Sequence, residues 1–130
     1  MPEGEGPGIG MVLAAGRGSR LRPLTDRIPK PAVPLLGQPL VSRALSTLRN
    51  AGVGELHVNL WHLPDALSEI LGSESAETCP LKVHVEEDLL GTAGGVLNAV
   101  GRQPSSDILV HNGDVVYLGD LDNLWSQESE

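Results

Sequence analysis

Aromatic residues are almost missing from this chain: it has no Phe, one Tyr and two Trp. The 40% of residues that are hydrophobic are therefore mainly Leu, Val, Ile and Ala. Such residues fill a parallel sheet buried under helices on both faces better than an aromatic-rich sandwich. At 130 residues, one domain is expected.

Cysteine and long apolar runs are also scarce. The single cysteine, Cys79, cannot form an intramolecular disulfide, and it has no neighbouring base that would activate it, so a structural role is expected. No apolar run approaches the roughly 18 residues of a membrane span, and there is no signal-peptide core. We therefore expect a cytoplasmic protein without a membrane partner.

Net positive charge is lacking too, since the formal net charge is −8, which disfavours nucleic acid as a partner. The charge is unevenly spread. Seven of the nine Lys and Arg residues, but only three of the seventeen Asp and Glu residues, lie in the first 50 positions. The basic residues concentrate around a glycine-containing stretch at 13–39.

That stretch reads LAAGRGSRLRPLTDRIPKPAVPLLGQP. Gly16 and Gly18 allow a sharp turn that brings backbone N–H groups close to an anion, and the cations Arg20 and Lys30 follow nearby. The pattern predicts a phosphate-binding turn, although two glycines in isolation are more typical of a plain tight turn. It is neither a P-loop, which ends in Gly-Lys-Ser/Thr, nor a dinucleotide fingerprint, because Leu21 stands where the third glycine belongs.

Periodicity and breaker residues predict strands separated by helices, and hence a parallel α/β sheet. The expected strands are 9–14, 55–60, 81–86 and 107–111; the expected helices are 39–50, 64–71, 92–100 and a final one from 118 to 125 with Asp120 as N-cap. Residues 1–8 are expected to form a disordered leader, and the prolines of 15–37 to exclude a regular helix and favour an extended path. With strand order 3-2-1-4, a ligand should sit at the carboxyl ends of strands one and four, where the glycine turn meets Asn112-Gly113-Asp114.

Three motifs together resemble the sugar-phosphate nucleotidylyltransferase family, of the mannose-1-phosphate guanylyltransferase-like or a related type. They are L-A-A-G-x-G-x-R-L-x-P-L-T with P-K-P and P-L-x-G-x-P-L, then Leu90–Gly95, then Asn112-Gly113-Asp114. The resemblance implies a Rossmann-like, mostly parallel sheet with flanking helices, the glycosyltransferase-A-like nucleotidyltransferase core in truncated form. Residues 9–130 would be its nucleotide-binding half, because family members continue into a longer second half.

The resemblance also implies a reaction, in which NMP passes from an NTP to a sugar 1-phosphate and pyrophosphate is released with Mg²⁺ as cofactor. Arg20 and Lys30 would be catalytic, neutralising the pyrophosphate and steadying the α-phosphate, and Asp114 would hold the metal. After an Asn-Gly pair, Asp114 is also typical of an ordinary turn. The expected nucleotide-binding residues are Leu13, Ala14, Ala15, Gly16, Gly18, Glu86, Gly91, Thr92 and Asp114.

Glu86 and Glu87 precede the glycine turn that in the family contacts the base. A solvated loop is the plain interpretation, whereas a carboxylate reading N–H donors gives a slight preference for GTP or UTP. Two other functions stay open: a non-catalytic nucleotide-binding or regulatory module, and a cytidylyl- or molybdenum-cofactor-type transferase, which generally lacks P-L-T and P-K-P. Without the family's second half we expect slow turnover and self-association into a homo-oligomer.

Overall fold

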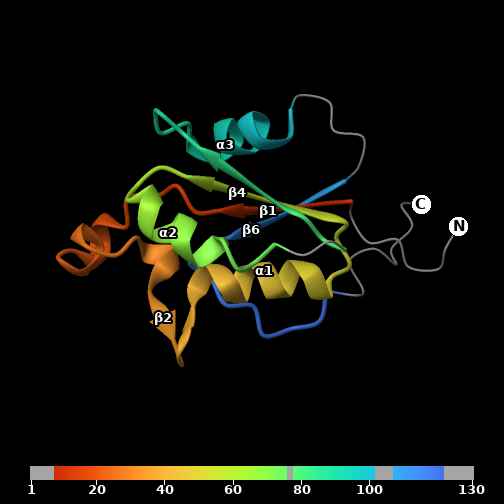
Figure 1. Ribbon diagram of the computed structural model, residues 1–130, viewed down its shortest axis with the longest axis horizontal. Coiled ribbons are helices and arrows are strands. Elements are labelled where there is room, and N and C mark those ends of the chain that lie inside the picture. Colours follow the sequence, from red (N-terminus) through yellow and green to blue (C-terminus); the bar gives the residue numbers. More distant parts are fainter. Residues whose placement is uncertain (1–7, 76–77, 102–106, 122–130) are drawn as a thin grey trace, which may run out of the picture.

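The computed structural model describes residues 8–75, 78–101 and 107–121. Its centre is a four-stranded sheet in the order β5-β4-β1-β6, and every neighbouring pair is parallel. The strands are β1 (Ile9–Leu13), β4 (Glu55–Leu60), β5 (Leu81–Val85) and β6 (Ile108–Asn112). This confirms the predicted parallel sheet and its 3-2-1-4 order, with β1 in the interior between β4 and β6 (Figure 1).

Helices cover both faces of the sheet. Figure 1 shows α1 (Leu40–Asn50) and α2 (Pro64–Leu71) on one face and α3 (Gly91–Val100) on the other. In α1 the apolar residues Val41, Ala44, Leu45 and Leu48 recur at helical spacing, and all four are buried. They pack with Leu56 and Val58 of β4 in the main core, so this face of the sheet carries most of the buried apolar surface.

The segment between β1 and α1 differs from the expected extended path. It contains three 3₁₀ helices, η1 (Ser19–Leu21), η2 (Leu24–Asp26) and η3 (Lys30–Ala32), and a small antiparallel hairpin of β2 (Pro34–Leu35) and β3 (Gln38–Pro39). The expectation was wrong because a proline's fixed φ also suits the first position of a short helical turn. Pro23 and Pro29 stand at the N-caps of η2 and η3.

Arg43 of α1 holds the hairpin in place. Its Nε and Nη2 both donate to the Leu35 carbonyl, at 3.1 and 2.7 Å. Arg49, at the other end of the helix, is partly buried and pairs with Glu74 at 3.0 Å. Both arginines therefore attach α1 to its neighbours.

Two of the sequence expectations reach beyond the described residues. Residues 118–121 are not helical, and the rest of the expected final helix, 122–125, lies outside the described part, as do residues 1–7 of the expected leader.

Cys79 is buried and free, with its thiol 3.5 Å from the Val53 carbonyl. In the part of the chain that is described, no helix is long and apolar enough to cross a membrane.

A chain of polar side chains lies on the face of β4 and β5 opposite the main core. The rings of His57 and His84 are joined by an Nδ1···Nε2 contact of 2.9 Å, and His57 Nε2 lies 2.9 Å from the Glu55 carboxylate. The pKa of Glu55 is lowered mainly by the hydrogen bond from His57, which outweighs the opposing effect of burial, and further by Lys82. The pKa of His84 is lowered by burial and then by the positive charges of His57 and Lys82.

These two shifts predict that acid destabilises the fold. Both folded-state pKa values lie below the ordinary values of 6.5 for His84 and 4.5 for Glu55, so the unfolded chain binds protons first. The stabilisation that each group contributes is complete at a pH above its ordinary pKa, and it is lost as the pH falls through its pKa in the folded protein. We expect the free energy of unfolding, measured by denaturant titration, to decrease from about pH 7 to about pH 4.

The matched variants are His84→Gln and His111→Gln, because His111 lies outside this chain of side chains. His84→Gln should flatten the upper part of the pH profile, between about pH 7 and 5, and His111→Gln should leave it unchanged. Identical slopes in the wild type and His84→Gln would contradict this prediction.

Candidate functional site

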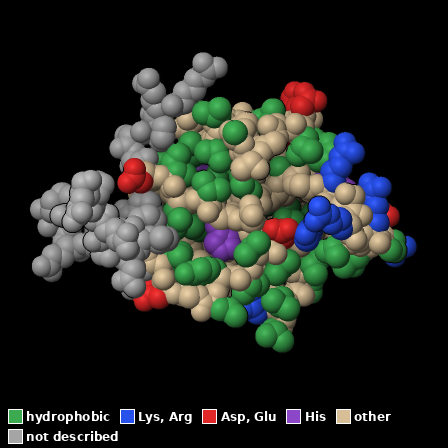
Figure 2. All heavy atoms as spheres, turned by 180° about the vertical axis from the view of Figure 1, so that it is seen from behind, with side chains coloured by type: hydrophobic (Ala, Val, Ile, Leu, Met, Phe, Trp, Pro, Cys, Tyr) green, Lys and Arg blue, Asp and Glu red, His purple; other side chains and the backbone are tan. Residues whose placement is uncertain are grey.

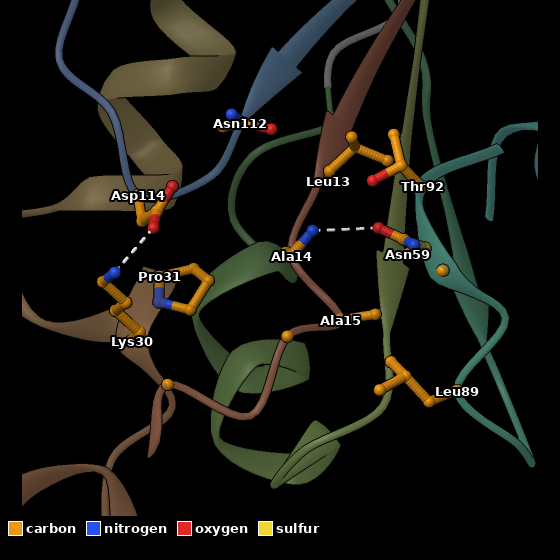
Figure 3. A pocket seen from close by; sticks show the side chains of 13 residues that line it. Leu13, Ala14, Ala15, Lys30, Pro31, Asn59, Leu89, Thr92, Asn112 and Asp114 are labelled. Atoms are coloured by element: carbon orange, nitrogen blue, oxygen red, sulfur yellow. Dashed lines mark hydrogen bonds and ion pairs between the residues drawn. The ribbon is translucent and has the colours of Figure 1, made fainter. Parts of the chain in front are cut away.

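A cavity of about 390 Å³ opens at the carboxyl ends of the parallel strands, a size that suits a small ligand (Figure 3). Its walls come from segments far apart in the sequence: the turn after β1, η3, the end of β4, the start of α3 and the turn after β6. The lining residues are Leu13, Ala14, Ala15, Gly16, Gly18, Lys30, Pro31, Asn59, Leu89, Gly91, Thr92, Asn112 and Asp114. Nine of the eleven residues predicted for the site are among them.

The glycine turn forms the first wall. Gly18 has a φ of 63°, and a Cβ there would lie 2.9 Å from the Thr25 side chain and 3.1 Å from that of Lys30, so only glycine fits without strain. The buried Thr25 donates its hydroxyl to the Gly18 carbonyl at 2.6 Å. The Thr25 carbonyl in turn bonds His62 Nε2 at 2.6 Å, so the turn is tied to the segment that follows β4.

The turn after β6 forms the second wall, next to the glycine turn. Gly113 donates its N–H to the Leu13 carbonyl at 2.8 Å, and a Cβ on Gly113 would come within 2.9 Å of that oxygen. This close approach brings Asp114 across to η3, where its Oδ2 lies 2.7 Å from Lys30 Nζ (Figure 3). Both side chains are about one third exposed, so the ion pair stands at the cavity surface and is open to solvent.

The third wall is the start of α3, where Gly91 and Thr92 line the cavity. Gly91 adopts a φ of 73°, a left-handed conformation that other residues rarely take. No acidic residue stands within the first turn of α3 itself, and the carboxylate at this helix end is that of Glu86, which accepts a hydrogen bond from the N–H of the N-cap residue Leu90.

Glu86 was predicted as a nucleotide-binding residue, but it lies behind the lining. The side chain is 5% exposed, its Oε1 accepts a hydrogen bond from Asn59 Nδ2 at 2.7 Å, and its Oε2 accepts one from the Leu90 N–H at 3.3 Å. Both carboxylate oxygens thus bond protein groups, while the neighbouring Glu87 is exposed.

Arg20 is the other predicted residue that does not line the cavity. It lies in η1 with an exposed side chain. The basic side chains of this segment gather at one end of the molecule, where Figure 2 shows Lys and Arg close together. Arg17 stacks on the Trp61 ring, with its guanidinium carbon 4.8 Å from the centroid, so Trp61 supports the glycine turn.

Four lining residues were not among the predicted site residues: Pro31, Asn59, Leu89 and Asn112. A signal existed for two of them. Asn59 and Asn112 are polar residues at or near the carboxyl ends of two parallel strands, which is where ligands bind in such a sheet. Pro31 and Leu89 carry no comparable signal.

The described residues contain no group of three or more His, Cys, Asp or Glu side chains that could hold a metal ion. At the cavity, Asp114 offers one carboxylate, beside the amide of Asn112. This donor set fits a hard cation such as Mg²⁺ only if a ligand supplies further oxygens, as phosphates do.

The sequence is similar to those of several named nucleotidyltransferases. It is 36% identical over 114 residues to mannose-1-phosphate guanylyltransferase of Mycobacterium tuberculosis, covering 88% of this chain and 32% of the relative. It is 41% identical over 113 residues to N-acetylmuramate alpha-1-phosphate uridylyltransferase of Neisseria meningitidis, covering 86% and 48%. The crystal structure of HddC from Yersinia pseudotuberculosis complexed with GMP-PN matches with a TM-score of 0.68 and 27% identity, over 82% of this chain and 47% of that one.

The chain thus spans between about a third and a half of the length of these proteins. The sequence model of the nucleotidyl transferase family matches residues 9–130, which is nearly the whole chain and includes every wall of the cavity. The chain belongs to the nucleotidyl transferase family.

Proposed function

We propose that this chain forms the nucleotide-binding part of an enzyme that transfers NMP from a nucleoside triphosphate to a sugar 1-phosphate and releases pyrophosphate. The observation that carries the proposal is the meeting of Lys30 and Asp114, 2.7 Å apart, beside the glycine turn. A cation, a carboxylate and a glycine turn at the carboxyl ends of β1 and β6 are what a metal-bound triphosphate requires.

In the proposed complex the triphosphate lies on the turn from Ala15 to Gly18. Lys30 contacts the α-phosphate, and Arg20 swings in from the exposed surface of η1 to the leaving pyrophosphate. The base lies against the wall formed by Leu89, Gly91 and Thr92. Phosphoryl chemistry of this kind needs no protein nucleophile, since positioning and charge neutralisation supply most of the rate.

The proposal includes a magnesium ion, which the Asp114 carboxylate would hold together with phosphate oxygens and water. When bound, the ion neutralises phosphate charge and orients the triphosphate. The chain's own part is to hold Asp114 at the cavity through the close contact of Gly113 with Leu13.

The relatives support the class of substrate, because they are a guanylyltransferase and a uridylyltransferase acting on sugar 1-phosphates. They also agree with a preference for GTP or UTP. We further propose a cytoplasmic location, for which the lone thiol of the buried Cys79 is suitable, and self-association through apolar side chains exposed on the described surface, such as Val85 and Leu97.

The function is tested by measuring triphosphate binding and pyrophosphate release with ATP, CTP, GTP and UTP and a panel of sugar 1-phosphates. We expect Mg²⁺-dependent binding with GTP or UTP preferred, and pyrophosphate release that requires a sugar 1-phosphate. Binding of all four without preference would remove the base assignment, and binding without any sugar-dependent release would leave this chain a nucleotide-binding module.

Lys30 is tested by Lys30→Ala. Loss of a charge-assisted contact to phosphate should weaken triphosphate binding or slow turnover by about 1.5–3 kcal/mol, while thermal unfolding changes little. Arg20→Ala should act in the same direction. The matched control is Lys82→Ala, which removes an exposed lysine whose partner is Glu55. Equal affinity and turnover in wild type and Lys30→Ala, at low salt, would exclude the phosphate role.

Asp114 is tested by Asp114→Asn, which keeps the size of the side chain and removes its charge. Addition of Mg²⁺ should strengthen triphosphate binding by the wild type, and most of that gain should vanish in the variant. Asp65→Asn, in the exposed first turn of α2, serves as the control. A variant that keeps the full Mg²⁺ dependence would show that Asp114 does not hold the ion.

A further inference from the structure

Asn59 lies at the end of β4 between the two walls that the proposed function assigns to the phosphates and the base. Its side chain is 3% exposed, although the residue lines the cavity. It is paired in the sheet with Leu13 of β1 on one side and His84 of β5 on the other. A buried amide in this position must have its hydrogen bonds satisfied by the protein.

Both ends of the Asn59 amide are occupied. Oδ1 accepts a hydrogen bond from the Ala14 N–H at 2.9 Å (Figure 3). Nδ2 donates one to Glu86 Oε1 at 2.7 Å. The orientation of the amide follows from these partners, because a backbone N–H only donates and an ionised carboxylate only accepts.

The bond to Ala14 fixes the beginning of the glycine turn. β1 ends at Leu13, so Ala14 is the first residue beyond the sheet ladder, and its buried N–H bonds the Asn59 side chain. Without that acceptor the N–H would be left buried and unpaired, which costs about 1–3 kcal/mol. The direction in which the turn leaves β1 therefore depends on Asn59.

The bond to Glu86 reaches the other wall. Glu86 Oε2 accepts from the N–H of Leu90, the N-cap residue of α3, so the carboxylate links Asn59 to the point where α3 begins. The path from Ala14 through Asn59 and Glu86 to Leu90 is continuous. It joins the glycine turn to Gly91 and Thr92 through three hydrogen bonds.

Gly95 explains how α3 can lie so close to this path. A Cβ at residue 95 would be 2.5 Å from Asn59 Nδ2 and 3.1 Å from Glu86 Oε1. Any side chain there would have to displace α3 or break the bond between Asn59 and Glu86. The second glycine of the Gly94-Gly95 pair thus has a packing role, separate from contact with a nucleotide.

We propose that Asn59 is a positioning residue that sets the spacing between the phosphate wall and the base wall, so that base preference depends on it although it need not touch the base. The inference rests on the proposed function, since it assumes that a nucleotide bridges the two walls. It also assigns to Glu86 a part in base selection that acts through Leu90 and α3.

The test compares the wild-type chain with Asn59→Leu, which has a similar volume and cannot form either hydrogen bond. Affinities are measured by calorimetry for the four triphosphates with Mg²⁺ and for inorganic tripolyphosphate, which has no base. We expect the preferred triphosphate to lose about tenfold or more, because both hydrogen bonds of the path are lost and the two walls that this ligand spans shift relative to each other. The ratio between the best and the worst triphosphate should fall toward one, and tripolyphosphate should lose much less. Asn98→Leu, an exposed substitution on α3, is the matched control and should keep the wild-type ratio.

Gly95→Ala should reproduce the loss of preference, because it breaks the same contact from the other side. General destabilisation would lower all affinities together and leave their ratio unchanged. If the wild type binds no triphosphate, the proposed function itself fails. If the wild type shows a preference and folded Asn59→Leu keeps it, only the role of Asn59 is overturned.

Asn59→Asp gives an independent readout, and it decides the matter if Asn59→Leu does not fold. At neutral pH the new carboxylate of residue 59 repels that of Glu86. In acid the two carboxylates can share one proton, so that a hydrogen bond between them replaces the one from Asn59 to Glu86. The other oxygen of residue 59 can still accept the hydrogen bond from the Ala14 N–H. The affinity and base preference of this variant, relative to wild type at the same pH, should recover between about pH 8 and pH 5.5. Absence of that recovery in a folded variant would refute the proposal.

Discussion

Parallel pairing of β1 with both β4 and β6 is the constraint on which the rest of this molecule depends. Residue for residue, Leu13 is opposite Asn59 on one side and Asn112 on the other, so three chain segments end at one level of the sheet. The cavity begins at this level, where the turns that follow β1 and β6 and the end of β4 contribute to its walls. Because a strand slip of one residue would reverse which side chains face the core, the buried apolar residues Val12 and Val58 also fix the register at the site.

Much of this arrangement could be predicted from the sequence. The parallel sheet and the helices on both faces follow from alternating strand and helix patterns and from the handedness of their connections. The meeting of the glycine turn with Asn112-Gly113-Asp114 follows once the strand order 3-2-1-4 is assumed, and the structure has that order. The path of residues 15–37 could not be predicted, because it depends on distant contacts. The Leu35 carbonyl is held by Arg43, and the Thr25 carbonyl by His62, which is 37 residues further along the chain.

Glu86 illustrates a second limit of sequence interpretation. Next to a glycine turn, a carboxylate suggests contact with a base edge, and the sequence does not indicate that a buried Asn lies within hydrogen-bonding distance. In the structure Asn59 and Leu90 bond its two oxygens, and the first of these is 27 residues away. Local pattern identifies the residues near a site, whereas the three-dimensional contacts decide which of them face the ligand and which hold the walls.

The ion pair between Lys30 and Asp114 has a consequence for how the cavity is filled. In the free chain each of these charges is the counterion of the other, at 2.7 Å. On the proposed function, a metal-bound triphosphate brings its own cation and anion, so Asp114 exchanges an ammonium for a metal and Lys30 exchanges a carboxylate for a phosphate. Binding is then a double exchange of partners in which no charge is left unpaired. Triphosphate without the metal can replace only the partner of Lys30, and the metal without triphosphate can replace only the partner of Asp114.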